Sequence, residues 1–256
     1  MRTIAIINLK GGVGKTTTVI NMAAGLARLG HRVLTIDADP QANLTSFYGL
    51  RGEDCNTLLD LLEGRATCVE DLIYDTRQDG VRILPSCIDL ISADISSVYS
   101  GGAYKAIADL KEVLPESDAA CDYILIDCPP SFTAASVAAI YAADDIIIPV
   151  EVDAYAIGGM AQLIKQIESV RKIQPRIRIA GVLLTKYFNT PAMVQGASAL
   201  RASAVPVFET VIHRSARVTE AGFKSMALRD YSPHSSASRD YLRLVAEYLE
   251  GVPEHE

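Results

Sequence analysis

The sequence predicts an α/β fold, with helices on both faces of a doubly wound, mostly parallel sheet. Short runs of aliphatic and β-branched residues alternate with helix-patterned segments along nearly the whole chain. Several of these runs are apolar throughout, as in strands buried on both faces. The first run ends in a glycine-rich loop that opens a helix. Because no linker or internal repeat is evident, one domain is expected over residues 1–256.

The expected strands are short apolar runs, most of which end at polar, proline or glycine residues. They cover residues 3–9, 32–36, 81–84, 122–127, 146–150, 178–185 and 205–208.

Apolar residues at helical spacing predict the helices. In the first, Val19, Met22, Ala23 and Leu26 share one face, and Gly30 ends the pattern. The expected helices cover residues 16–29, 57–62, 104–114, 160–172, 193–202 and 235–250, with another beginning after Pro130. We expect a loop at 211–217 and a frayed end at 251–256.

The glycine-rich loop at residues 10–18 is typical of a phosphate-binding site. Backbone N–H groups and the positive end of the following helix would converge on one anion. Lys15 can reach the β- and γ-phosphates, and the Thr16 hydroxyl can ligate Mg²⁺. This P-loop predicts a site for a nucleoside triphosphate, here ATP, with magnesium. Its expected binding residues are Gly11, Gly12, Val13, Gly14, Lys15, Thr16 and Thr17.

Lys10 is an extra cation in this loop, and Leu9 stands where the usual pattern has glycine. A second lysine in an electropositive loop is costly unless it meets negative charge. That charge could come from its own nucleotide or from one bound by a facing subunit. A solvated lysine without a partner is the alternative interpretation.

Aspartates follow two of the predicted strands, where open parallel sheets place their ligands. Asp37 and Asp39 follow the second strand, and Asp127 ends the strand at 122–127. Carboxylates there can hold metal-bound waters or orient an attacking water. The alternative for Asp39 and Asp127 is capping of a following helix.

Charge is unevenly distributed along the chain. Net charge is −7, but residues 165–243 carry 13 Lys and Arg against 5 Asp and Glu, while residues 1–164 carry 11 against 22. A basic segment in an acidic protein suits a localised polyanion-binding face, although partnerless surface cations are an equal alternative. Five scattered cysteines indicate neither disulfides nor zinc. No leader or membrane span is evident, so we expect a cytoplasmic protein.

Four motifs resemble those of ParA/Soj-type DNA-partition ATPases. They are NLKGGVGKTT at 8–17, DADPQAN at 37–43, IDCPPS at 126–131 and VIHR at 211–214. LPS at 84–86 and GVLLT at 181–185 extend the resemblance over nearly the whole chain. The lysine-bearing loop is the deviant Walker A form, which MinD-like and nitrogenase-iron-protein-like ATPases share.

The resemblance implies a slow ATPase that forms a sandwich dimer on ATP binding, with Lys10 touching the partner subunit's nucleotide. Lys15 would bind phosphate, and Asp39 would position the attacking water. Thr16 would ligate Mg²⁺, while Asp37 and Asp127 would hold it through waters. The residues beside the adenine would be Thr185, Ile212, His213 and Arg214.

The resemblance further implies nonspecific double-stranded DNA binding, nucleoid association and stimulation by a ParB-like centromere-binding partner. The sequence differs from the family motifs at two places. Residues 186–190 lack the Asp and Arg common in the family after this strand, and His213 replaces a usual proline. An ordinary loop role for His213 stays open. The candidate DNA contacts are Lys186, Arg201, Arg217 and Lys224.

Three alternatives stay open. A MinD-like ATPase that positions cargo at a membrane would need a basic amphipathic C-terminal helix, whereas residues 240–250 end acidic. A nitrogenase-like electron carrier would need bridging cluster cysteines, and Cys87 and Cys128 lie in other contexts. A nucleotide-gated scaffold without hydrolysis would not need both Asp37 and Asp39.

Overall fold

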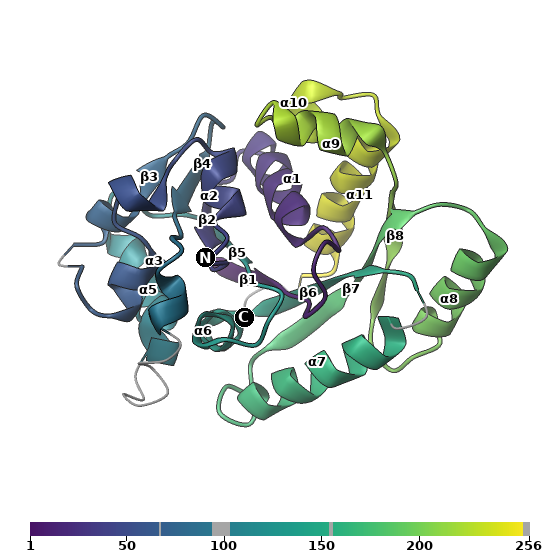
Figure 1. Cartoon of the computed structure of the whole chain (residues 1–256), viewed down its shortest axis with the longest axis horizontal. Helices are drawn as coiled ribbons and strands as arrows, with labels where there is room; N and C mark the ends of the chain where they lie inside the picture. Colours follow the sequence, from purple (N-terminus) through teal and green to yellow (C-terminus); the bar gives the residue numbers. More distant parts are fainter. Residues whose placement is uncertain (67, 94–102, 154–155, 253–256) are drawn as a thin grey trace.

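The computed structural model describes residues 1–66, 68–93, 103–153 and 156–252. Within these residues, eight strands form one sheet in the order β3-β4-β2-β5-β1-β6-β7-β8 (Figure 1). All neighbours pair in parallel except β3 and β4 at one edge. The strands are β1 Arg2–Ile6, β2 Val33–Asp37, β3 Tyr74–Asp75, β4 Val81–Leu84, β5 Tyr123–Asp127, β6 Asp145–Glu151, β7 Arg178–Tyr187 and β8 Val207–His213.

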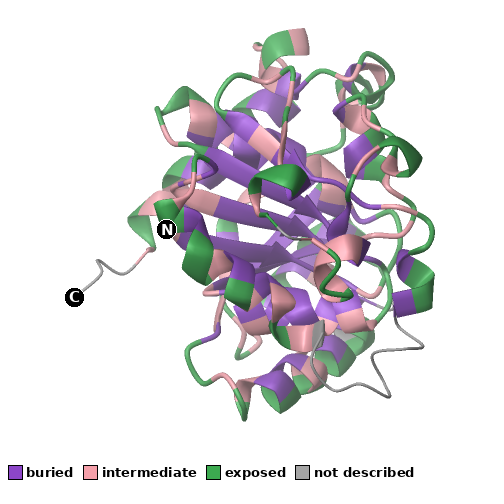
Figure 2. Ribbon diagram, turned by 90° about the vertical axis from the view of Figure 1, so that its left-hand side faces the viewer, coloured by how far each residue is buried: buried purple, intermediate pink, exposed green. Residues whose placement is uncertain are grey.

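Helices cover both faces of this sheet, which confirms the predicted fold class (Figures 1 and 2). One face packs against α1 Lys15–Arg28, α2 Asn43–Phe47, α9 Ala216–Phe223, α10 Leu228–Tyr231 and α11 Ser236–Glu250. The other packs against α3 Leu58–Leu62, α5 Ala106–Val113, α6 Ala134–Ala142, α7 Ala156–Arg171 and α8 Pro191–Arg201. Short 3₁₀ turns cover Gly52–Asp54, Glu70–Leu72, Ala103–Lys105 and Leu114–Glu116.

The expected loop at 211–217 is wrong. Strand β8 continues to His213, and α9 begins at Ala216. Carboxylates of α11 stabilise the edge of β8: Glu247 accepts hydrogen bonds from the backbone N–H groups of Glu209 (2.7 Å) and Thr210 (2.9 Å). Since these contacts join residues far apart in sequence, local periodicity does not predict them. Residues 251 and 252 form a turn, and the rest of the expected frayed end lies outside the described residues.

Four short elements were not predicted, namely β3, α2, α9 and α10. The first two and α10 span five residues or fewer, too short for periodicity to identify. Predicted boundaries elsewhere differ by up to a few residues; for example, α7 begins at Ala156 rather than at residue 160.

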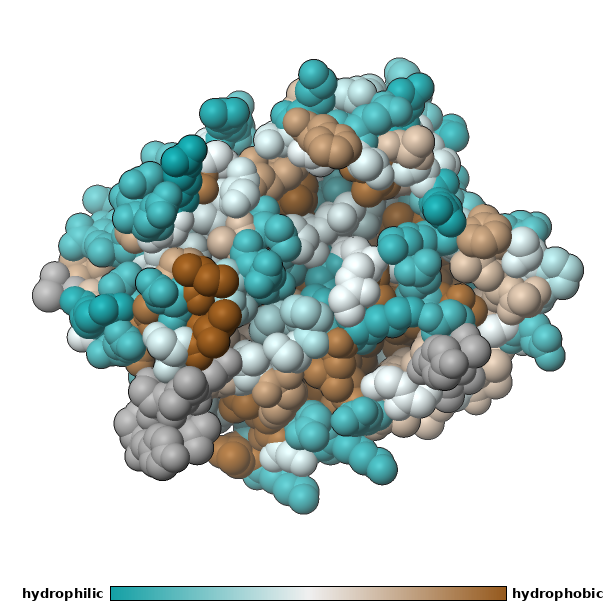
Figure 3. Space-filling model, viewed as in Figure 1, coloured by the Kyte–Doolittle hydropathy of each residue, from teal (hydrophilic) through white to brown (hydrophobic). Residues whose placement is uncertain are grey.

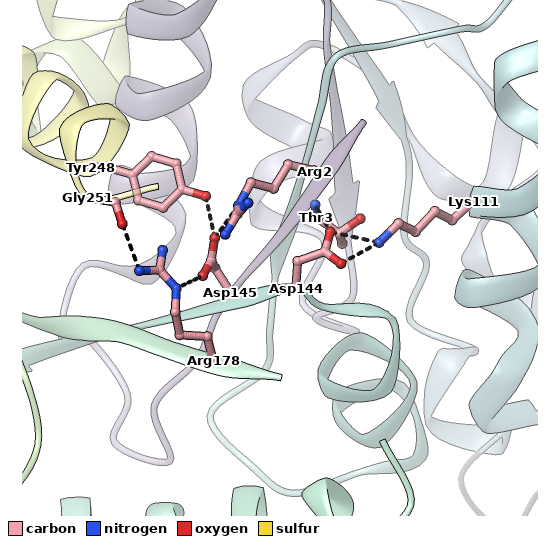
Figure 4. A network of polar contacts seen from close by, with 8 residues as sticks. All are labelled: Arg2, Thr3, Lys111, Asp144, Asp145, Arg178, Tyr248 and Gly251. Carbon is pink, nitrogen blue, oxygen red and sulfur yellow. Dashed lines mark hydrogen bonds and ion pairs between the residues drawn. The ribbon is translucent and has the colours of Figure 1, made fainter. Parts of the chain in front are cut away.

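A buried ion-pair network lies where β6 begins (Figure 4). Asp145 is fully buried and accepts hydrogen bonds from Arg2 Nε (2.6 Å), Arg178 Nε (2.6 Å) and the Tyr248 hydroxyl (2.7 Å). Arg178 also donates to the carbonyl of Gly251 (2.8 Å). Burial alone would raise the pKa of Asp145, but the three hydrogen bonds outweigh it and lower the pKa. The network joins β1, β6, β7 and α11.

The visible surface in Figure 3 is mostly hydrophilic, with brown apolar patches of limited size. Among the described helices, none combines the length and hydropathy that a membrane span requires.

Candidate functional site

The carboxyl ends of the central strands bring the predicted site residues together. Asp127 on β5 is in register with Ile6 on β1 and with Asp37 on β2. The loop after β1, dark purple in Figure 1, therefore starts beside both aspartates. This edge of a parallel sheet is where such folds place their ligands.

The loop after β1 has the backbone that a phosphate cradle needs. Gly12 and Gly14 have φ values of 74° and 92°, which residues with a Cβ rarely adopt. Gly14 is the N-cap of α1, so the first N–H groups of that helix face the loop. The hydroxyl of Thr185, at the end of β7, donates to the carbonyl of Val13 (2.8 Å) and fixes the loop against the sheet.

Lys15 lies inside the cradle, with only 7% of its surface exposed. Its ammonium group donates to the carbonyl of Lys10 (3.2 Å) across the loop. Burial lowers the pKa of Lys15, while Asp127, Cys128 and Asp39 nearby favour the charged form. A phosphate group would supply the negative charge that this buried cation lacks.

Asp127 is a buried carboxylate without hydrogen-bond donors. It is 1% exposed, and neither of its oxygens accepts a hydrogen bond from any described residue. Burial raises its pKa well above the usual range, and Asp37 raises it further, although Thr16 and Lys15 lie close enough to oppose the shift. An unpaired buried carboxylate fits a hydrated cation, because metal-bound water donates hydrogen bonds to it.

Asp37 organises the loop that follows β2. One oxygen accepts from the N–H of Asp39 (3.2 Å), and the other accepts from the N–H (2.8 Å) and hydroxyl (2.7 Å) of Thr45. The Thr45 hydroxyl in turn accepts from the N–H of Ser86, after β4 (2.8 Å). Burial raises the pKa of Asp37 to about 6, and these hydrogen bonds limit the rise.

Thr45 was missing from the predicted site. A hydroxyl-bearing residue eight positions after Asp37 gave no local signal, since its partners lie on different strands. Within the described ranges, no three acidic, histidine or cysteine side chains converge as direct metal ligands. Thr16, in the first turn of α1, could bind Mg²⁺ directly, whereas Asp127 and Asp37 could act through metal-bound waters.

Asp39 lies at the rim of the site and is partly exposed. One of its oxygens accepts a hydrogen bond from the N–H of Gln41 (2.9 Å), which fixes the side chain in a tight turn. The N-cap of α2 is Ala42, so the helix-cap interpretation of Asp39 is wrong. The N-cap of α6 is Thr133, so Asp127 does not cap that helix either.

The Lys10 ammonium group pairs with a carboxylate outside the phosphate loop. This carboxylate belongs to Asp153, after β6, and the side chain of Lys10 is 43% exposed. Its backbone N–H donates to Asn8 Oδ1 (2.9 Å), and Asn8 Nδ2 donates to the carbonyl of Pro149 (2.6 Å). The backbone carbonyl of Lys10 accepts the hydrogen bond from Lys15, while the Lys10 cation pairs with a partly exposed carboxylate that a phosphate could replace.

A pocket of about 460 Å³ adjoins Gly14 and Thr17 at the start of α1. All four residues expected beside adenine line it, namely Thr185, Ile212, His213 and Arg214. Sequence reasoning missed Tyr241 and the α9 residues Val218 and Thr219, which also line the pocket. The pocket is large enough for a nucleoside whose phosphates enter the adjacent cradle.

The four candidate DNA contacts lie on different elements. Lys186 pairs with Glu151 (3.1 Å) at the rim of this pocket, and Arg217 pairs with Glu220 (2.5 Å) on α9. Arg201, at the end of α8, donates to the backbone carbonyl of Glu209 (3.1 Å). Lys224 follows α9, is exposed, and forms no ion pair within the described part of the chain.

Cys128 is a buried packing residue beside the site. It is fully buried, and burial raises the pKa of its thiol above the usual range, so it is not a reactive thiolate. All five cysteines are free thiols.

Comparison with known proteins agrees with this geometry. The family model described as an AAA domain matches residues 1–179. The chain is 40% identical to the chromosome-partitioning ATPase Soj of Thermus thermophilus, covering 99% of this chain and 98% of that protein. It is 37% identical to the chromosome partitioning protein ParA of Caulobacter vibrioides, covering 97% and 94%.

Two solved structures share the fold over nearly the whole chain. A McdA variant from Cyanothece in complex with ATP has a TM-score of 0.85 and 28% identity, covering 100% of this chain and 99% of that one. The septum site-determining protein MinD of Pyrococcus horikoshii, with Mg-ADP, has a TM-score of 0.78 and 27% identity, covering 96% and 95%.

The fold and the phosphate cradle define a P-loop ATPase that uses ATP and Mg²⁺. More narrowly, the chain belongs to the Soj/ParA family of ATPases.

Proposed function

We propose that this ATPase partitions a plasmid or chromosome as an ATP-dependent sandwich homodimer with a nucleotide bound at each shared site. The dimer binds double-stranded DNA without sequence preference on the nucleoid, in the cytoplasm, and a ParB-like centromere-binding partner stimulates it. Residues 1–256 act as one domain. Two relatives that are named for chromosome partitioning are 37–40% identical over almost the whole chain, and they support a role in DNA partition.

The orientation of Lys10 carries the proposal. A second lysine in the loop could serve its own nucleotide or a facing one, and this one extends to Asp153 at the protein surface. The exposure of its ammonium group supports a contact with a neighbour's phosphates, because Lys15 already occupies the cradle of its own subunit.

The remaining residues then have distinct roles. Lys15 and the backbone N–H groups of the loop bind the β- and γ-phosphates. Mg²⁺, when bound, would supply positive charge that offsets the charge developing on the phosphates. Thr16 would ligate the ion, Asp127 and Asp37 would hold its waters, and Asp39 would orient the attacking water for in-line displacement.

Charge supports the DNA-binding step. The basic excess lies in residues 165–243, and Lys224 keeps a solvent-exposed ammonium group. Because Lys186 and Arg217 form internal ion pairs, they would exchange a carboxylate for a DNA phosphate on binding. Such contacts are largely independent of sequence and weaken with salt.

The MinD-like alternative receives less support. Its membrane anchor would be the apolar side of a C-terminal helix, but α11 packs Tyr241, Leu244, Val245 and Tyr248 into the protein core. This face is therefore committed to folding rather than to a lipid surface.

Two measurements test the proposal. Light scattering on a sizing column should give a dimer mass with ATP and Mg²⁺ and a monomer mass with ADP; a monomer in both would exclude the sandwich. In gel-shift assays, ATP should give sequence-independent DNA binding that falls steeply with salt. Absence of binding in ATP at low salt would exclude the DNA step.

A further inference from the structure

We propose that His213 recognises the 6-amino group of the nucleotide base and sets the preference of this ATPase for adenine. The inference rests on the proposed placement of the nucleoside in the pocket beside Gly14. His213 is the last residue of β8, and it lines this pocket.

The imidazole ring of His213 is held from two sides. Asp240 on α11 accepts hydrogen bonds from both the backbone N–H (3.0 Å) and ring Nδ1 (2.9 Å) of His213, through the same oxygen. Asp240 is only 3% exposed, which makes it a fixed anchor. The ring of Tyr187 meets the histidine edge-on at 6.0 Å between centroids.

This anchoring determines which ring nitrogen can bind a ligand. A carboxylate can only accept, so Nδ1 must carry the hydrogen. In the neutral ring, Nε2 then carries a lone pair and is an acceptor. An acceptor suits the exocyclic amino group of adenine and disfavours a base with a carbonyl at that position.

Several other polar groups around the pocket already have partners. The Thr185 hydroxyl donates to Val13, and Lys186 pairs with Glu151. Thr18 shares a hydrogen bond with the hydroxyl of Tyr241 (3.3 Å), and the Ser215 hydroxyl caps α9. Half-exposed and rigidly held, the His213 ring is the acceptor at this wall that is best prepared for a ligand.

The test compares ADP with purine riboside 5′-diphosphate, which lacks only the 6-amino group. Diphosphates avoid hydrolysis, and Mg²⁺ is present throughout. Binding is measured by calorimetry at about pH 8. The protein should bind ADP about tenfold more tightly than the analogue, as expected for one well-placed hydrogen bond. His213→Ala should bring this ratio close to one.

Two amide variants test which ring nitrogen acts. Gln places its terminal amide near the Nε2 position, whereas Asn reaches only the Nδ1 position. His213→Gln should therefore retain most of the preference, and His213→Asn should lose it as Ala does. A His213→Ala protein that keeps the full ratio would overturn the role of His213, as would an Asn variant that keeps it.

Val218→Trp separates this inference from the placement of the nucleoside. Val218 lines the same pocket, and the larger side chain should weaken both diphosphates by equal factors. If Val218→Trp weakens both while His213→Ala keeps the ratio, the placement stands and only the role of His213 fails. If Val218→Trp weakens neither, the base lies elsewhere and both fail.

Discussion

A buried carboxylate lies at each end of the central strands, and the two differ in whether hydrogen-bond donors surround them. Asp145, at the start of β6, has two arginines and a tyrosine hydroxyl as donors (Figure 4). Asp127, at the far end of β5, is equally buried and accepts no hydrogen bond from the described residues. Hydrogen bonds lower the pKa of the first, while burial raises that of the second.

The difference separates stability from function. A satisfied buried ion pair holds elements together, and breaking it is costly. An unsatisfied buried carboxylate lowers stability, and it is retained where a ligand supplies the missing partner. The amino end of the sheet is therefore expected to govern folding and the carboxyl end to govern nucleotide chemistry.

Removing the satisfied carboxylate should have the largest effect on stability. Asp145→Ala leaves Arg2 and Arg178 without their acceptor and should lower the free energy of unfolding by about 3 to 5 kcal/mol. Urea denaturation measures it. The control is Asp144→Asn, next along the chain. Asp144 is partly exposed, and the amide keeps an acceptor for the N–H of Thr3 (2.8 Å) while it removes the charge that pairs with Lys111 (2.7 Å), so about 1 kcal/mol is expected. Equal losses would contradict the role given to the network.

The opposite effect on stability is expected at the carboxyl end of the sheet, where Asp127 lies. Asp127→Asn removes a carboxyl group whose ionisation burial opposes, so at a pH where that group is ionised the free energy of unfolding without nucleotide should rise by about 1 to 3 kcal/mol. Hydrolysis should fall roughly 10- to 100-fold, as for an outer-shell metal partner. Urea denaturation and phosphate release at several Mg²⁺ concentrations measure the two effects. A variant less stable than the parent would show that Asp127 is already satisfied in the free protein.

The carboxylates at the two ends of the strands should also have opposite effects on how stability depends on pH. Because the folded-state pKa of Asp37 (about 6) and that of Asp127 are raised, the folded protein binds more protons, and stability falls as pH rises from about 4 through these values. Each such group contributes a slope of up to about 1.4 kcal/mol per pH unit.

Asp145 works in the other direction. Its lowered pKa gives stability that is present above about pH 4 and lost as pH falls through the folded value. Unfolding free energy measured between about pH 3 and 8 should therefore no longer rise with pH at the acid end in Asp145→Ala. In Asp127→Asn it should fall less as pH rises toward 8. Mg²⁺ with ADP should also reduce the fall, since the metal displaces the proton.

Thr45 gives the smallest expected effect. Thr45→Val keeps the shape but removes the hydroxyl between Asp37 and Ser86, and should cost about 1 to 2 kcal/mol of unfolding free energy. Thr76→Val, which loses a hydroxyl bond to the carbonyl of Val81 away from the site, is the matched control. Only Thr45→Val should also slow hydrolysis, because Thr45 fixes the loop that carries Asp39.

The carboxyl end was largely predictable from the sequence, whereas the amino end was not. The phosphate loop follows a local pattern, and Asp37 and Asp127 each end an apolar strand, so neighbours in the chain reveal them. Asp145 acquires its partners from residues 143, 33 and 103 positions away. Local periodicity in the sequence cannot predict contacts at such separations.

The same reason explains the wrong loop at 211–217. His213 belongs to β8, where Asp240 on α11 binds its N–H, and that pairing spans 27 residues. The sequence could place His213 near the base by resemblance, but only the fold reveals the carboxylate that fixes its ring.

The role of Lys10 across the dimer is tested most directly by mixing two inactive variants. Lys10→Ala keeps Asp39 but cannot supply Lys10, and Asp39→Ala does the reverse; both keep the cradle residue Lys15. If Lys10 acts on the partner's nucleotide, one site of each mixed dimer is complete, and phosphate release should recover on mixing. A mixture no more active than the sum of the two variants would show that Lys10 does not act across the dimer.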